Sequence, residues 1–222
     1  MDYQGSTINN YNFQVAPRGD VGGGVTSGGI SDNRSARFFN IGHADDSNRA
    51  VGMARTYSTY GAIGTVFQNN SGSALSSFTL GYSGQQWRRE GTTETALYFE
   101  YLVTNDVSNL DIISDPSNWQ RVSALQFNSP KFDGGGTDLD GIVHKATINS
   151  AEINVNIGIS DYLVMRWYQD RSDVNGDPTT VDHALSIDDV NFSVTAVPEP
   201  SSLAIFVGFL ALGVALSRCK RR

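Results

Sequence analysis

The sequence predicts an all-β fold, an antiparallel jelly-roll-like β-sandwich, followed by a single C-terminal transmembrane helix. Apolar and polar residues alternate in several segments, most clearly where Ile153, Val155, Ile157 and Ile159 are separated by Asn154, Asn156 and Gly158. No apolar stripe with helical spacing occurs before the C-terminal segment. Alternation places one side of a strand in the core and the other in solvent, as in antiparallel sheets.

The chain divides into three parts. Residues 1–33 are rich in Gly, Asn and Ser and are expected to form a lead-in, and residues 34–195 the sandwich, with residues 196–222 as a tail. Turn residues separate eight to eleven expected strands, a number that suits a jelly roll. The clearest are Arg37–Ile41, Val51–Tyr57, Ala62–Gln68, Leu75–Ser83, Thr95–Thr104, Ile153–Ile159, Tyr162–Gln169 and Ala184–Thr195.

In the last expected strand the apolar residues change from odd-numbered to even-numbered positions. Leu185 and Ile187 are odd-numbered, whereas Val190, Phe192 and Val194 are even-numbered. Side chains alternate between the faces of a strand, so one face can hold all these residues only if one residue is inserted. We predict a β-bulge at Asp188-Asp189, unless the strand begins only at Val190.

Charge and cysteine content limit the possible functions. Residues 1–217 contain 12 of the 16 basic residues and all 23 acidic ones, a net charge of −11. Binding to nucleic acid or anionic lipid needs basic patches, so neither is expected of this body. The single cysteine, Cys219, lies in the tail, and the body must therefore be held together without disulfides.

The tail, residues 196–222, has the composition of a membrane anchor. The motif Val197, Pro198, Glu199, Pro200 precedes an apolar segment, residues 201–217, and a basic end with Arg218, Lys220, Arg221 and Arg222. As a helix the apolar segment would be about 26 Å long, close to the thickness of a hydrocarbon core. It is apolar on every face, and its basic end is expected in the cytoplasm. The alternative is a terminal helix packed on the body.

A Pro-Glu-Pro triplet, one apolar helix and a terminal basic cluster together resemble the PEP-CTERM sorting signal of Gram-negative bacteria. The resemblance implies recognition by an exosortase, a membrane protease-transpeptidase that is expected to cut near the triplet. It implies an exported protein, held in the inner membrane and then moved to the cell surface or outside the cell. Carriers of this signal commonly belong to species that make extracellular polysaccharide.

The N-terminus does not fit export, since Asp2 is acidic and no apolar run follows Met1 as in a signal peptide. We expect a truncated or misassigned start; the alternative is a cytosolic protein anchored by its tail.

Two segments of the body resemble signatures of bacterial secreted β-sandwich proteins. Asn69–Gly72 followed by Gly84–Arg88 resembles "NNTG…YTGEQWR", and Asp182–Asp189 resembles "DHALAIDD". Many of those proteins carry the same sorting tail, and the resemblance implies a fold and export but no particular activity. Gln85 stands where the signature has Glu.

One loop has a partial calcium-binding pattern. Asp170, Asp173, Asn175 and Asp177 supply oxygens around Gly176, as calcium loops do. Arg171 stands where the first Asp of the full pattern belongs, so a bare polar turn is the alternative. If metal binds, Asp182 or Asp188 could add ligands. The acidic loop 133–141 is interpreted first as mobile and second as a cation site.

Patterns of catalysis are absent from the sequence. The three histidines lack the spacing of zinc ligands, Gly81–Gly84 does not form a G-x-S-x-G elbow, and the carboxylate spacing of jelly-roll glycosidases is missing. His183 is expected to make a structural hydrogen bond. No enzyme activity and no cofactor other than calcium are predicted.

Three tryptophans could pack in the core or stack on a sugar ring. Trp167 alternates with Met165 and Leu163 and is expected in the core. Trp87, beside Arg88, is the candidate for exposed ligand contact, with core or rim packing as its alternative.

Together these features predict an exported, non-enzymatic surface or extracellular-matrix protein with a structural or adhesive role in exopolysaccharide or biofilm. The alternative is a lectin-like carbohydrate-binding module, with calcium as an optional ligand. The expected partners are the exosortase, the membrane and extracellular polysaccharide.

Overall fold

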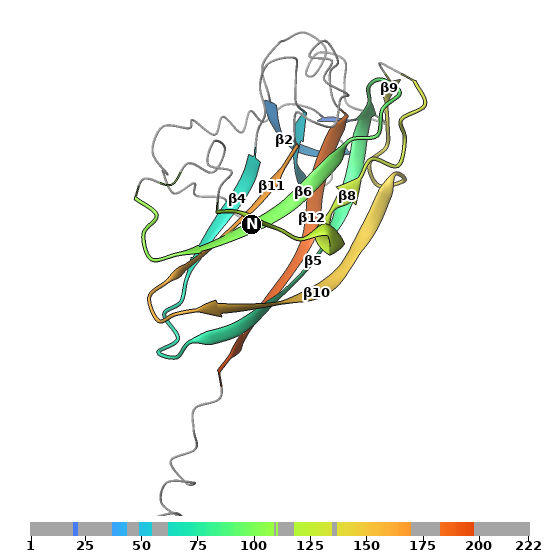
Figure 1. The fold of residues 1–222 in the computed structure, drawn as a ribbon. Helices are drawn as coiled ribbons and strands as arrows, with labels where there is room; N and C mark the ends of the chain where they lie inside the picture. Colours follow the sequence, from blue (N-terminus) through green and yellow to red (C-terminus); the bar gives the residue numbers. More distant parts are fainter. Residues whose placement is uncertain are drawn as a thin grey trace, which may run out of the picture.

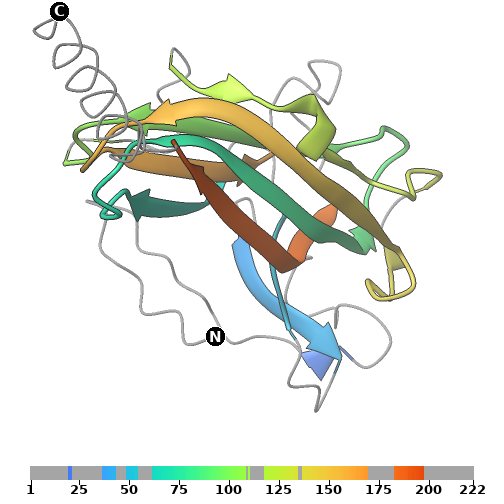
Figure 2. The same ribbon diagram turned by 90° about the horizontal axis from the view of Figure 1, so that it is seen from below.

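The structure is a computed structural model that describes residues 20–21, 37–43, 49–54, 62–108, 110, 118–134, 137–169 and 183–197. In these ranges the chain forms strands and one short 3-10 helix, η1 (Ser123–Leu125). The strands make two sheets that pack as the layers of a sandwich (Figure 1), as the second view also shows (Figure 2). The predicted all-β sandwich is confirmed for this part of the chain.

The larger sheet has seven strands in the order β1-β2-β3-β12-β5-β10, with β9 also paired to β5. All pairs are antiparallel except β1 with β2. Its strands are β1 (Asp20–Val21), β2 (Arg37–His43), β3 (Ala50–Ala54), β5 (Leu75–Arg89), β9 (Thr137–Asp138), β10 (Lys145–Ile157) and β12 (Ala184–Ala196).

The smaller sheet has five strands in the order β4-β11-β6-β7, with β8 also paired to β6. Its strands are β4 (Ala62–Gln68), β6 (Ala96–Thr104), β7 (Gln120–Arg121), β8 (Phe127–Asn128) and β11 (Tyr162–Tyr168). Strands β7 and β8 are only two residues long, so they cover only part of the outer edge of β6.

Apolar side chains from both sheets meet between the layers, as the period-two pattern predicts. Burying each large apolar side chain contributes about 1.5–3 kcal/mol, so this cluster is the main source of stability. Its most buried members include Phe78, Leu80, Leu97, Phe99, Leu125, Phe127, Leu163, Met165, Trp167 and Leu185. The prediction that Trp167 lies in the core is confirmed.

The predicted bulge in the last strand is confirmed. Asp188 pairs with Ser83 and Asn191 with Gly81, so β12 has one more residue than β5 between these pairs. Asp189 adopts a φ of 49° at this point. The bulge turns Phe192 toward the core, where its ring stacks on Phe67 with centroids 4.6 Å apart.

Two strands, β5 and β10, differ most from their predicted bounds. Strand β5 continues to Arg89 rather than ending at Ser83, and β10 covers Lys145–Ile157. Ile159 lies beyond the end of β10 and is 59% exposed, so its assignment to that strand's buried face is wrong. Asp161 terminates the strand by accepting a hydrogen bond from the Gly158 N–H at 3.0 Å.

No helix in the described ranges is long and apolar enough to cross a membrane. The predicted helix over residues 201–217 lies outside those ranges.

Replacing Gly84 with alanine should destabilise the sandwich. A Cβ at this position would lie 2.2 Å from Cγ of the Phe127 ring, and overpacking of this kind costs about 1–3 kcal/mol. Urea denaturation followed by tryptophan fluorescence should show the Gly84→Ala midpoint well below that of wild type. Gly134→Ala is the control, because its nearest contact would be 3.4 Å from the Arg89 guanidinium; equal midpoints for the two variants would contradict the packing described here.

Candidate functional site

The two signature segments of the body lie side by side. Strand β5 contains Gly84–Arg88 and β12 contains most of the second signature, and the two strands pair with Ser186 opposite Gln85 and Ile187 opposite Gly84. Segments about a hundred residues apart therefore form one antiparallel ladder. Polar side chains of the two signatures can therefore form hydrogen bonds with one another, and their contacts show such bonds.

Trp87 is buried between these strands and the segment after β9, with only 1% of its surface exposed. Its Nε1–H lies 3.0 Å from both Gln85 Oε1 and Ser186 Oγ. Gly141 packs flat on the indole, since a Cβ there would lie 2.2 Å from the ring. The interpretation of Trp87 as an exposed ligand contact is therefore wrong, and core packing, its alternative, is correct. A register shift between Ala184 and Leu185 leaves Trp87 as an extra residue of β5.

The two glutamines before Trp87 are also structural. The buried Gln86 amide bonds both backbone groups of Lys131, donating to its carbonyl at 2.7 Å and accepting from its N–H at 2.8 Å. Gln85 donates from Nε2 to Asp188 at 3.2 Å. The glutamate of the signature could not donate this bond at that position when ionised.

Arg88 is committed to ion pairs rather than free to bind a ligand. Its guanidinium bonds Glu90 and, at 2.8 Å, Asp138, and its side chain is only 11% exposed. Arg89 pairs with Asp133 at 2.6 Å. The prediction of Arg88 as a ligand residue does not fit this arrangement. These ion pairs hold Asp133 and Asp138 of the acidic loop 133–141 against β5, which its interpretation as a mobile loop did not include.

His183 makes the structural hydrogen bonds that its position predicted. The Glu90 N–H donates to Nδ1 at 2.7 Å, and Nε2 lies 3.1 Å from the Thr93 carbonyl. Nδ1 is thus an acceptor and Nε2 the protonated nitrogen. Burial of the ring lowers the pKa of His183 below its ordinary value of 6.5, because protonation at Nδ1 would oppose the Glu90 N–H in a site shielded from water.

A metal site is not evident in the described part of the chain, where no group of His, Cys, Asp or Glu is arranged to hold an ion. The predicted calcium ligands, Asp170, Asp173, Asn175 and Asp177, lie outside that part, so the calcium site stays a prediction.

The body ends where the predicted sorting motif begins. Strand β12 ends at Ala196, and the N–H of Val197 donates to the Ala74 carbonyl at 2.8 Å. Val197 itself is 41% exposed. Pro198, Glu199, Pro200 and the basic cluster lie outside the described residues.

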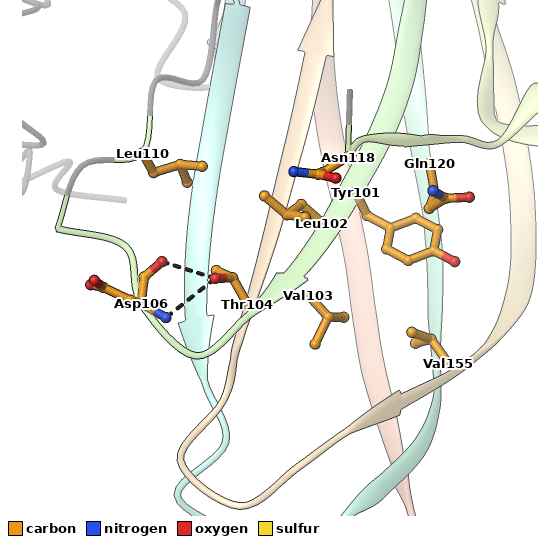
Figure 3. A pocket seen from close by; sticks show the side chains of 9 residues that line it. All are labelled: Tyr101, Leu102, Val103, Thr104, Asp106, Leu110, Asn118, Gln120 and Val155. Carbon is orange, nitrogen blue, oxygen red and sulfur yellow. Dashed lines mark hydrogen bonds between the residues drawn. The ribbon is translucent and has the colours of Figure 1, made fainter. Parts of the chain in front are cut away.

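A groove of about 660 Å³ opens beside the end of β6 (Figure 3). It forms because β7 pairs only with Glu100 and Tyr101 of β6, leaving the last residues of that strand without a partner on this side in the described part. The groove is lined by Tyr101, Leu102, Val103, Thr104, Asp106, Leu110, Asn118, Gln120 and Val155. Val155 comes from β10 of the other sheet, so the groove lies across the open side of the sandwich.

The groove combines an apolar surface with polar ends. The carboxylate of Asp106 is held by Ser108, which lowers the pKa of Asp106 through hydrogen bonds from the Ser108 N–H and hydroxyl. Thr104 Oγ1 bonds the Asp106 backbone (Figure 3). Sequence reasoning missed this groove; its only signal was Tyr101 in an alternating strand.

A buried ion pair on the outer face of the smaller sheet was also not predicted. Arg166 donates to Glu100 at 2.6 Å and 3.0 Å, and both side chains are less than 8% exposed. Trp119 covers Arg166, with 4.0 Å from the guanidinium carbon to the ring centroid. Arg121 adds a bond to Glu100 at 3.0 Å. These contacts satisfy the buried charges, so we interpret the cluster as structural.

Comparison with protein-family models and with curated proteins gives no match. Among solved structures the chain is similar to TmCBM61, a carbohydrate-binding module determined in complex with β-1,4-galactotriose. The TM-score is 0.35 and the identity 11%, over 80% of this chain and 99% of that chain. A likeness this weak establishes neither a shared fold nor a shared ligand.

Acid should destabilise the body through His183. Folding lowers the pKa of His183. Below about pH 6.5 the unfolded chain therefore binds more protons at this residue than the folded chain does. The free energy of unfolding decreases as the pH falls from there, until the pH has passed the pKa of the folded state. Urea midpoints measured between about pH 7.5 and pH 5.5 should decrease more steeply for wild type than for His183→Asn. A wild-type slope in His183→Asn would contradict the assignment.

Replacing Gly141 with alanine tests the packing around Trp87. The added Cβ would force the indole or the segment after β9 to move, so we expect a loss of about 1–3 kcal/mol in the free energy of unfolding. The measurement is denaturant unfolding, with the exposure of tryptophan to acrylamide quenching as a second readout. Unchanged quenching and unchanged stability would mean that Gly141 does not close over Trp87.

Proposed function

We propose that this chain is an exported, non-catalytic protein of the cell surface or extracellular matrix, with a structural or adhesive role in exopolysaccharide or biofilm. In this proposal residues 197–222 are its sorting signal and an exosortase is its processing partner. The proposal rests on the order of parts in the tail, and one structural observation supports it. The last strand ends at Ala196, immediately before the motif, so a cut near Glu199–Pro200 would leave every described strand complete.

The tail would work through simple physical steps. The apolar segment 201–217 inserts in the inner membrane, and the basic cluster stays on the cytoplasmic side. Val197 is exposed at the end of the last strand, which supports the proposal that a membrane protease acts on the triplet that follows it. The acidic body, with its net charge of −11 over residues 1–217, repels anionic lipid and remains in solution.

A second candidate function is carbohydrate binding, as a lectin-like module. The specific observation in its favour is the groove beside β6, which joins an apolar surface to amide, hydroxyl and carboxylate groups. Trp87 and Arg88 do not serve this function, because one is buried and the other is ion-paired.

The sorting proposal predicts a defined product in the native host. The mature protein should end near Glu199–Pro200 and leave the inner membrane, as measured by intact mass and cell fractionation. Replacing Pro198, Glu199 and Pro200 with alanine should keep the full-length chain in the inner membrane, while alanine at Ser201 and Ser202, just beyond the motif, should allow processing. A wild-type chain that stays full-length in the inner membrane would leave a plain anchor, and a body protected from external protease would overturn export.

A further inference from the structure

We propose that the groove beside β6 is a binding site for a neutral polysaccharide chain. This inference rests on carbohydrate binding, the second proposed function, and is independent of the sorting signal. It assigns both a place and a class of ligand, from the shape, charge and hydrogen-bonding state of the lining residues.

The shape of the groove suits an extended chain. The pairing between β6 and β7 ends at Tyr101 and Gln120. Val155 of β10, in the opposite sheet, lines the same groove. The groove is thus an open channel rather than an enclosed cavity, and Figure 3 shows its lining side chains on β6, on the segments before β7 and after β6, and on β10. A polymer can enter such a channel without needing a free end.

The charge of the lining excludes a strongly anionic ligand. Among the described residues that line it there is no lysine, arginine or histidine, and Asp106 is the one carboxylate. The hydrogen bonds from Ser108 keep that carboxylate ionised. A polyanion such as a uronate chain would meet a negative group without a compensating cation, whereas an uncharged chain can donate hydroxyl groups to Asp106.

Three polar side chains of the groove take no part in the hydrogen bonds among the described residues. The Tyr101 hydroxyl and the amides of Asn118 and Gln120 make no hydrogen bond to another described residue. Each amide offers both a donor and an acceptor, which matches pairs of sugar hydroxyls that also donate and accept. Val103 and Val155 add apolar surface on the side of β6 that faces the other sheet, and Leu102 adds some on the opposite side. The C–H groups of a sugar ring can pack on such surface.

Tyr101 is held in place for such contact. Its ring meets Phe78 in an edge-to-face arrangement, with centroids 5.2 Å apart and an interplanar angle of 78°, while its backbone pairs with both β7 and β11. An aromatic group that is already fixed loses little conformational entropy when a ligand binds.

A peptide strand fits this groove less well. Strand addition needs a run of unpaired backbone groups along an edge, and in the described part of the chain the end of β6 beyond its pairing with β7 comprises Leu102–Thr104. The side-chain hydroxyl and amide groups favour a hydroxyl-rich ligand over an added strand.

The experiment is affinity electrophoresis of the full chain in a sugar-free zwitterionic detergent. The gels contain, separately, neutral α-glucan, β-glucan, galactan, mannan and xylan, and the polyanion alginate. Wild type should be retarded by at least one neutral polysaccharide and not by alginate. The double variant Asn118→Ala/Gln120→Ala should bind that polysaccharide about tenfold more weakly, which corresponds to about 1.4 kcal/mol, because the hydrogen bonds of two amides are lost. Both side chains are exposed, so the fold should survive.

A matched control removes two amides elsewhere. Asn154 and Asn156 are exposed residues of β10 that alternate with the lining residue Val155, and Asn154→Ala/Asn156→Ala should bind as wild type. If wild type binds but the Asn118/Gln120 variant binds equally well, carbohydrate binding stands and the groove is not its site. If no neutral polysaccharide retards the wild type, carbohydrate binding and this inference both fail. Retardation by alginate alone would overturn the ligand class.

Discussion

The pairing of β5 with β12 is the interaction on which the rest of the fold depends. Strand β5 bonds to β12 on one side and to β10 and β9 on the other, so its register sets the position of most of the larger sheet. The pair joins residues 99 positions apart, as the bond between Trp87 and Ser186 shows, and a long loop must be closed to form it. The buried side chains Gln85, Trp87 and Ser186, which bond one another across the two strands, then fix the register, because a slip of one residue would leave their polar groups without partners.

The buried and exposed faces of the strands follow from the alternation of apolar and polar residues, so the sequence was sufficient to predict them. The faces of β5, β6 and β11 follow from period two, and Phe78, Phe99 and Trp167 lie in the core as that pattern requires. The bulge in β12 was predictable for the same reason. Leu185 and Phe192 can lie on the same face of β12 only if one residue is inserted between them. The register shift after Asp188 provides this extra residue.

Exposure and grooves could not be predicted, because they depend on contacts between distant segments. Trp87 stands next to two arginines in the sequence, yet it is buried because Gly141, more than fifty residues later, closes over its ring. The groove likewise depends on where β7 leaves β6 and on Val155 of the opposite sheet. Neither arrangement has a signature in the residues that it affects, so the sequence prediction placed a ligand contact at a tryptophan that is buried.

Sorting and binding, as proposed, are connected by the geometry of one end of the sandwich. Val155 lies at the same level of the larger sheet as Thr195 and Ala196, since both strands pair there with Ser77 and Leu75 of β5. The groove therefore opens near the end from which the tail leaves. Four residues, Val197–Pro200, separate that end from the apolar segment, and fully extended they span at most about 14 Å. A tethered body would hold its groove close to the bilayer, where a long polysaccharide has little room, so processing of the tail would come before binding in the matrix.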